Sequence, residues 1–197
     1  MSKKELLINL ANTVKDFKIN LNENDILNLL KIEKRWPRHY PWDIGKTGKY
    51  TVGLISNLNV NIGAFLYSSN SYLDYEKWYN LYNLGYTTIL SHVLDLTDEL
   101  RKLEKLLLEN LGDKVNANFY FSKPGQKPSF DEHSHFYDVI VKQIYGNVTW
   151  SVNGKIIILK PQETLYIPIG AKHAVIDKNE KKLSLTINIG VHHLNDA

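Results

Sequence analysis

The C-terminal part of the chain most constrains the fold, because from Val115 onward apolar residues recur at about every second position. Side chains alternate between the two faces of a β-strand, so this period indicates half-buried strands. Turn signals separate the segments, among them the hairpin dipeptide Asn153-Gly154. Seven short strands with little helix between them predict an antiparallel sandwich or barrel. We expect these strands at 115–122, 137–145, 148–152, 155–159, 163–167, 174–177 and 183–191.

The first part of the chain is predicted to be helical and mixed. Apolar residues at helical spacing indicate helices at 4–17, from Asn22 or Asn24 to about residue 32, and most clearly at 97–111. A short helix is expected at 73–81, with strands within 51–65 and at 85–90. The sequence lacks repeats and linkers, so we predict one domain over residues 1–197. Residues 1–112 would be wrapped on a barrel built from 113–191.

Composition narrows the chemistry that the chain can support. With 197 residues, 43% of them hydrophobic, it can bury a sizeable core. It has no cysteine, so disulfides and thiolate metal sites are excluded, and a bound metal must use histidine, carboxylate or water. A net charge of +3 is too mild to indicate direct nucleic-acid binding. Neither a signal peptide nor an apolar run of about 18 residues is visible, so we expect a cytoplasmic protein not associated with membranes.

Three histidines are the candidate metal ligands. His133 and His135 are separated by one residue, so on a strand beginning at His133 they would point the same way. His173 follows 38 residues after His135, behind a Pro-x-Gly turn that can aim its imidazole inward. Two ligands from one strand and one from a distant segment give a facial metal site with open positions, which is typical of catalytic metals.

The alternative is that these histidines are structural, which is the usual role of a lone histidine. We interpret the other four histidines in that way; they are His39, His92, His192 and His193. The pair is different because two neighbouring imidazoles repel one another if both are protonated, and a metal holds both neutral. Histidine ligation is compatible with Fe(II), Mn, Ni, Zn or Cu. Asp138 has the opposite strand parity to His135 and is expected to face away.

Several motifs resemble those of a known family. The HSH sequence at 133–135 followed by Asp138, and PIGAKH at 168–173, resemble the two motifs of the cupin superfamily. Over residues 85–187, the order and spacing of NFYFSKPGQ, HSHFYDVIVKQIYGNVTW and LKPQETLYIPIGAKH are similar to the JmjC-type cupin oxygenases, especially the ribosomal-oxygenase-like branch. The resemblance implies a double-stranded β-helix, or jelly-roll barrel, preceded by a helical region. It also implies a hydroxylase that depends on Fe(II) and 2-oxoglutarate.

The resemblance can be carried over residue by residue. His133 and His173 match the two iron-binding histidines, whereas His135 stands where the family has an acidic ligand. Tyr120 matches a tyrosine that contacts the co-substrate, and Val148 stands where the family usually has a lysine or arginine for the far carboxylate of 2-oxoglutarate. An alternating polar row on the last strand could supply further donors; it consists of Ser184, Thr186 and Asn188. Tyr120, Ser184 and Asn188 are therefore the candidate cofactor-binding residues.

Three functions remain open at this stage. The first is an Fe(II)- and 2-oxoglutarate-dependent oxygenase that hydroxylates a C–H bond of a peptide, a protein or a small molecule and that could form a homodimer. The second is a three-histidine cupin dioxygenase that does not use 2-oxoglutarate. This function fits the absence of the acidic ligand and of the basic anchor. The third is a non-catalytic cupin that binds a metal or small molecule. A lysine pointing at the metal would favour the first, the candidates being Lys123, Lys142 and Lys172.

Overall fold

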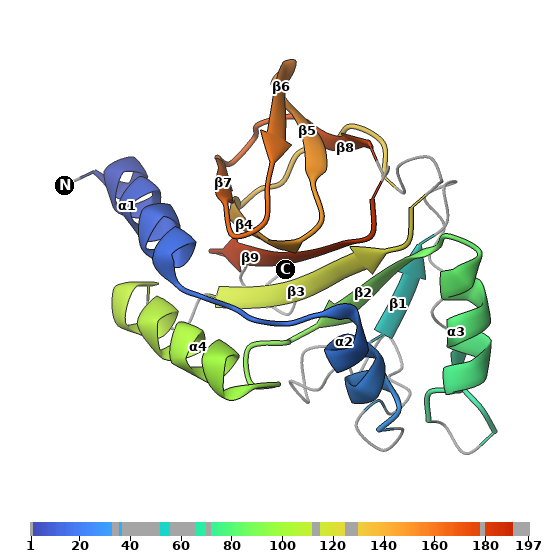
Figure 1. Ribbon diagram of the computed structural model, residues 1–197. Coiled ribbons are helices and arrows are strands. Elements are labelled where there is room, and N and C mark those ends of the chain that lie inside the picture. The colour runs from blue at the N-terminus through green and yellow to red at the C-terminus, as the bar shows by residue number, and fades with distance from the viewer. Residues whose placement is uncertain are drawn as a thin grey trace.

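The computed structural model describes residues 2–32, 36, 52–55, 66–69, 72–111, 115–124, 130–177 and 180–190. Among these residues, four helices lie in the first part of the chain, and seven of the nine strands follow the last of them. Figure 1 shows how they are arranged. The helices are α1 Lys3–Asp16, α2 Glu23–Leu30, α3 Tyr75–Asn83 and α4 Asp98–Leu111. The strands are β1 Val52–Ile55, β2 Thr87–Ser91, β3 Val115–Ser122, β4 Asp138–Tyr145, β5 Val148–Val152, β6 Lys155–Leu159, β7 Thr164–Ile167, β8 His173–Asp177 and β9 Lys182–Ile189.

The strands form two antiparallel sheets that face each other. The larger sheet has the order β1-β2-β3-β9-β4-β7, and the smaller sheet has the order β6-β5-β8. An isolated antiparallel bridge also pairs His133 with His173, the first residue of β8. The chain thus passes repeatedly from one sheet to the other between β3 and β9, which is the winding of a jelly roll. The predicted jelly-roll barrel with a helical N-terminal region is confirmed.

Strand β9 shows how the sequence separates the two faces of the larger sheet. Its apolar residues alternate with polar ones, and the apolar set joins the core cluster under the helices: Leu183, Leu185, Ile187 and Ile189. The residues in between point into the barrel, where Lys182, Ser184 and Thr186 line a cavity. One face of β9 is therefore core and the other is the wall of a site.

The helices cover the outer face of the larger sheet (Figure 1). Helix α1 begins with a capping box formed by Ser2 and Glu5, and it lies against β7 and β4. Thr164 of β7 donates a hydrogen bond to the carbonyl of Ala11 at 3.1 Å. Helix α4 turns the row Leu100, Leu103 and Leu107 inward. The N-terminal region thus supports the barrel strands from outside.

Some expectations from the sequence need adjustment. The second barrel strand begins at Asp138, so the histidine pair precedes it in an irregular segment instead of opening it. Of the aromatic-rich stretch from Trp36 to Trp42, only Trp36 falls in the described residues. It is fully buried, and its indole N–H donates to the carbonyl of Leu29 at 3.0 Å. Residues 56–65, within an expected strand region, lie outside the described residues.

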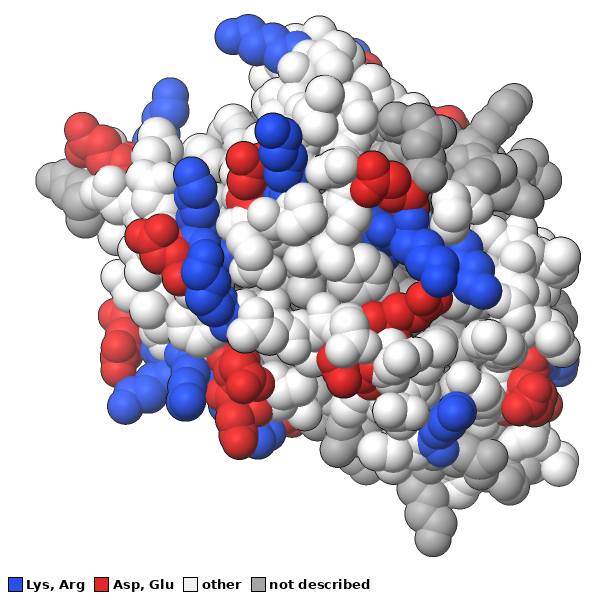
Figure 2. All heavy atoms as spheres, in the orientation of Figure 1, with Lys and Arg blue, Asp and Glu red and all other residues white. Residues whose placement is uncertain are grey.

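On the face seen in Figure 2, positively and negatively charged side chains are interspersed. No helix in the described ranges is long and apolar enough to cross a bilayer.

Candidate metal centre

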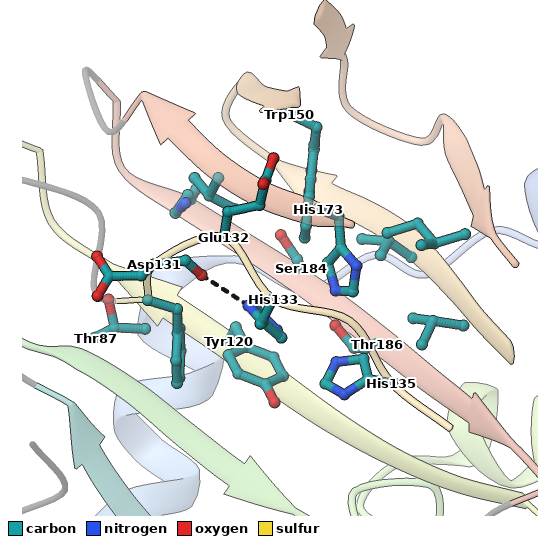
Figure 3. A pocket seen from close by; sticks show the side chains of 16 residues that line it. Thr87, Tyr120, Asp131, Glu132, His133, His135, Trp150, His173, Ser184 and Thr186 are labelled. Atoms are coloured by element: carbon teal, nitrogen blue, oxygen red, sulfur yellow. Dashed lines mark hydrogen bonds between the residues drawn. The ribbon is translucent and has the colours of Figure 1, made fainter. Parts of the chain in front are cut away.

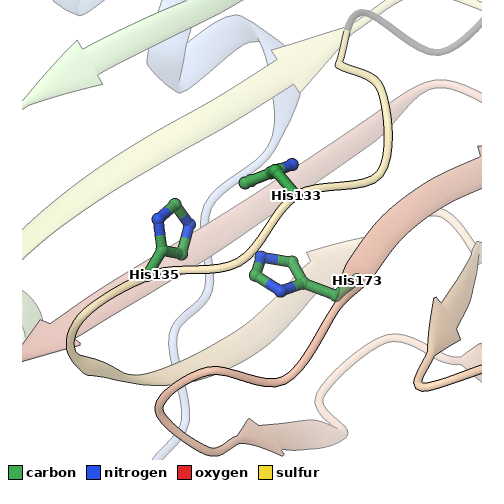
Figure 4. Close-up of side chains that lie close together, drawn as sticks. All are labelled: His133, His135 and His173. Atoms are coloured by element: carbon green, nitrogen blue, oxygen red, sulfur yellow. The ribbon is translucent and has the colours of Figure 1, made fainter.

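The three candidate ligands lie close together (Figure 4). The ring centroids are 4.5 Å apart for His133 and His173, 4.8 Å for His133 and His135, and 5.0 Å for His135 and His173. Each ring offers one nitrogen, and these three atoms lie within 4.8 Å of one another. Two segments that are far apart in sequence therefore bring three imidazoles to one point.

Backbone carbonyls orient two of the rings. The Nδ1 of His133 lies 2.8 Å from the carbonyl oxygen of Asp131, and the Nδ1 of His173 lies 2.9 Å from that of Ala171. A carbonyl can only accept, so each Nδ1 carries a hydrogen, and in the neutral ring the Nε2 then keeps its lone pair. A metal-binding histidine usually donates its other ring N–H to an acceptor in this way, which fixes the orientation of the ring.

His135 is oriented by an aromatic ring. Its imidazole stacks on Tyr137 with centroids 4.6 Å apart and planes within 9°. Burial, followed by the neighbouring His133 and His173, lowers the pKa of His135 to about 4. Burial also lowers the pKa of His173. Both rings are therefore neutral at pH 7, which is the protonation state that binds a metal.

A cavity of about 420 Å³ opens beside the three histidines (Figure 3). Its wall on β3 and β9 is polar, and its wall on β4, β7 and β8 is apolar. The polar wall carries Tyr120, Lys182, Ser184 and Thr186. The apolar wall carries Val139, Val141, Ile167 and Val175, and Trp150 of β5 lies beside it. The cavity can therefore hold a ligand with one polar and one apolar side.

The structure places the candidate cofactor-binding residues as follows. Tyr120 lines the cavity, and burial raises its pKa to about 12, so its hydroxyl remains protonated. Ser184 also lines the cavity, but its hydroxyl lies 2.6 Å from Oε1 of Gln143. The Nε2 of Gln143 donates to the carbonyls of Tyr145 and Gly146, so its Oε1 must accept from Ser184. The serine hydrogen is thereby committed to Gln143.

Asn188 lies elsewhere on β9. It is buried opposite Asn116 of β3 and Val139 of β4, and it is not among the residues that line the cavity. Its assignment as a cofactor-binding residue stays a prediction. The same holds for the contacts of Tyr120 and Ser184 with a cofactor.

The lysines named from the sequence do not line the cavity. Lys142 lies on the outer face of β4, where its ammonium donates to the carbonyls of Lys15 and Gln162 at 2.8 and 3.1 Å. Lys123 donates to Asn83 and lies over the ring of Tyr82. Lys172 is exposed and is not among the residues that line the cavity.

Among the described residues, the lysine in the cavity wall is Lys182, which sequence reasoning missed. It is 5% exposed, opens β9 and has the same strand parity as Ser184 and Thr186. The signal was present in the sequence, because the alternating polar row extends back by two residues from Ser184 to Lys182. The expected strand began at residue 183 and so omitted this position.

The donor set fits a divalent metal ion. His133, His135 and His173 would hold it as neutral nitrogen ligands, and the cavity leaves room for ligands that are not protein groups. Asp138, the nearest carboxylate after the pair, faces away as expected and accepts from Tyr166 and Ile169. Histidine ligation alone does not select one metal.

Comparisons with known proteins give structural neighbours. No family model matches the sequence, and no curated protein matches it. Among solved structures, the chain is similar to a cupin superfamily protein from Desulfitobacterium hafniense, with 22% identity, 39% of this chain and 68% of that chain covered, and a TM-score of 0.35. It is also similar to an RmlC-like cupin from Shewanella frigidimarina, with 15% identity, 43% and 72% covered, and a TM-score of 0.36.

An enzyme stands among the neighbours as well. A DMSP lyase from Ruegeria pomeroyi has 20% identity, with 40% of this chain and 39% of that chain covered, and a TM-score of 0.36. The strand order described above shows the jelly roll independently of these neighbours.

Proposed function

We propose that the protein is an Fe(II)- and 2-oxoglutarate-dependent oxygenase that hydroxylates a C–H bond. The observation that carries this proposal is that Lys182 lines the same cavity as His133, His135 and His173. A buried cation beside a metal centre suits an acid that chelates the metal at one end and reaches the cation with a second carboxylate. 2-Oxoglutarate has this form, with a 2-oxo acid group at one end and a carboxylate at the other.

Lys182 would hold the far carboxylate. Lys182 is 5% exposed as a residue, and an ion pair is stronger in a buried environment than at the surface. Tyr120 and Thr186 line the same cavity and offer hydroxyl groups. Lys182 thus supplies the basic anchor that the valine at position 148 does not supply.

The remaining residues define what the site does around the metal. When bound, Fe(II) would supply the activation of O₂ coupled to oxidative decarboxylation of 2-oxoglutarate. The three imidazoles orient the ligands, and the carbonyls of Asp131 and Ala171 keep two of the rings in the binding tautomer. The apolar wall excludes water from the side opposite Lys182.

The substrate is a peptide, a protein or a small molecule. A cavity of about 420 Å³ must hold the co-substrate together with the group that is hydroxylated. A side chain of a polypeptide or a compact metabolite therefore fits better than a folded surface. Nucleic-acid binding is not part of this proposal, and homodimer formation remains a prediction.

A second candidate is a three-histidine metalloenzyme that does not use 2-oxoglutarate. It is favoured by the ligand set, because His135 adds no negative charge to the metal centre. A substrate that itself chelates the metal and carries an acidic group would also engage Lys182. The two candidates differ in whether 2-oxoglutarate binds.

The deciding experiment is an anaerobic titration of the Fe(II)-loaded protein with 2-oxoglutarate. We expect the weak visible charge-transfer band of metal-chelated 2-oxoglutarate. Lys182→Met should weaken 2-oxoglutarate binding by about 10- to 100-fold, the value of a hydrogen bond to a charged group, with Fe(II) binding retained. Lys172→Met is the matched control, since that lysine is exposed and lies outside the cavity wall.

Two results would contradict the proposal. If Fe(II) binds and no band forms, 2-oxoglutarate is not the co-substrate, and the second candidate takes its place. If the band forms equally in Lys182→Met, the acid binds without the anchor that we assign.

A further inference from the structure

The carboxylate of Asp138 is buried on the side of β4 that faces away from the metal centre. It is 2% exposed and has three donors among the described residues. Oδ1 accepts from the hydroxyl of Tyr166 at 2.8 Å and from the backbone N–H of Ile169 at 3.1 Å. Oδ2 pairs with the ammonium of Lys3 at 2.9 Å. Burial alone would raise the pKa of Asp138, but these hydrogen bonds together with the charge of Lys3 outweigh it and lower the pKa, so the carboxylate is ionised at neutral pH.

One of the three donors belongs to the turn that leads to His173. Ile169 is the second residue of this turn, which is closed by a hydrogen bond of 3.0 Å from the N–H of Ala171 to the carbonyl of Pro168. Gly170 has φ +77°, a conformation that favours glycine. The carbonyl of Ala171 then accepts from Nδ1 of His173. The turn therefore sets the orientation of this ring.

The same turn also contacts the histidine pair. The N–H of Gly170 donates to the carbonyl of His135 at 3.0 Å. Asp138 itself follows His135 by three residues at the start of β4. The carboxylate and this backbone hydrogen bond thus join the two segments that carry the candidate metal ligands, on the side opposite the cavity.

We infer that Asp138 is a positioning residue of the metal centre, which fixes the 168–171 turn and through it the imidazole of His173. The inference rests on the metal-binding part of the proposed function and is independent of 2-oxoglutarate. Without the carboxylate, the N–H of Ile169 and the hydroxyl of Tyr166 lose their acceptor. The turn then no longer holds the Ala171 carbonyl in place, and the His173 ring gains rotational freedom that metal binding must remove.

The test measures metal affinity and the environment of the metal separately from folding. Co(II) is titrated into wild-type protein and Asp138→Ala, with the affinity and the visible absorption band of bound Co(II) as readouts. Denaturant unfolding of the metal-free proteins gives their stability. We expect about tenfold weaker Co(II) binding in Asp138→Ala, within the range for residues that support metal ligands, with a changed band.

Asp138→Asn separates the hydrogen bonds from the charge. Its amide oxygen can still accept from Ile169 and Tyr166, although the ion pair with Lys3 is lost. We expect affinity within about threefold of wild type and a band like that of wild type. This variant also keeps the inference testable if Asp138→Ala does not fold, because an affinity loss of tenfold or more in Asp138→Asn would overturn it.

Lys142→Met is the matched control. Lys142 lies on the same strand and the same outer face, is fully buried, and ties α1 to the barrel through the carbonyl of Lys15. It makes no contact with the turn among the hydrogen bonds of the described residues. We expect Lys142→Met to lower the unfolding midpoint while leaving the Co(II) affinity and band unchanged.

The outcomes separate this inference from the proposed oxygenase. Wild-type affinity and an unchanged band in Asp138→Ala would overturn the inference, as would an equal loss in Lys142→Met. If the wild-type protein binds Co(II) tightly but the Fe(II)-loaded protein forms no visible band with 2-oxoglutarate, the proposed oxygenase is overturned and the role of Asp138 is left intact. A wild-type protein that binds no Co(II) would overturn both.

Discussion

His133 and His173 lie directly opposite each other and exchange both of their backbone hydrogen bonds, at 3.0 and 2.8 Å. The pairing fixes the distance between the two backbones without any contribution from the imidazoles. The two side chains therefore meet because the chain pairs at this point, and the geometry of the site is present before a metal arrives.

This pairing predicts that His133→Ala removes metal binding without unfolding the protein. The backbone hydrogen bonds remain, while one of three ligands is lost. We expect at least about 100-fold weaker Fe(II) or Co(II) binding, with an unchanged far-ultraviolet circular dichroism spectrum. The measurement is a metal titration, with His92→Asn as control.

His92 is a suitable control because it does not line the cavity and has φ +58°, which asparagine tolerates. A loss of metal affinity in His92→Asn equal to that in His133→Ala would show that the effect is not specific to the three histidines.

Two glycines with the same backbone conformation provide a stability test. Gly146 has φ +71°, and a Cβ there would lie 2.0 Å from the carbonyl oxygen of Lys181. Gly154 has φ +77° and open space around the same position. Both alanine variants carry the cost of a left-handed conformation, about 1–2 kcal/mol, and only Gly146→Ala adds a backbone clash. We expect denaturant unfolding to show a clearly larger loss for Gly146→Ala than for Gly154→Ala, and equal losses would contradict this.

The hydrogen bonds of Gln143 predict a second difference in stability. This side chain is fully buried, with Nε2 donating to the carbonyls of Tyr145 and Gly146 at 2.7 and 3.0 Å. Gln143→Leu leaves both of these hydrogen bonds unmade and also deprives Ser184 of its acceptor. Since an unsatisfied buried polar group costs about 1–3 kcal/mol, we expect a loss of free energy of unfolding of about 2–4 kcal/mol.

Ser184→Ala is the comparison for Gln143→Leu. It removes one hydroxyl and leaves only Oε1 of Gln143 without its donor, so about 1 kcal/mol is expected from the same measurement. A larger loss in Ser184→Ala than in Gln143→Leu would show that the turn carbonyls do not depend on the glutamine.

The lowered pKa of His135 predicts how the metal-free protein responds to acid. The imidazole has a pKa near 6.5 in the unfolded chain and of about 4 in the folded protein. Between these values the unfolded state binds more protons, so stability falls as the pH decreases from about 6.5 to about 4. Urea midpoints measured across this range should fall less steeply in His135→Asn. A slope identical to wild type would show that His135 does not contribute.

Much of the barrel could be predicted from the sequence because its strands are local patterns. The strands at 115–122, 148–152 and 155–159 were predicted with the bounds that the structure shows. Alternation along a strand is a property of neighbouring residues, and the turn at Asn153-Gly154 separates two of them. The addition of β1 and β2 to the larger sheet was not predicted, because pairing of distant strands leaves no local signal.

In the candidate site, too, the local features could be predicted and the contacts between distant segments could not. The spacing of His133 and His135 indicated a shared direction, and the structure brings both to His173, although it does so in an irregular segment before β4. Lys182 was missed because the expected strand began one residue too late. The role inferred for Asp138 could not be predicted, since it depends on a turn that lies 31 residues away in sequence.

Strand β4 is buried on both faces along almost its entire length. Its inner residues Val139 and Val141 line the cavity, while Asp138 and Lys142 on the other face hold α1 and the 168–171 turn. Each position on β4 is therefore constrained by two neighbours, and variation there would disturb the ligand pocket and the scaffold together. A search for variants with altered ligand preference should leave β4 unchanged and vary the rim of the cavity, where Glu132 is exposed and Phe130 is half-buried.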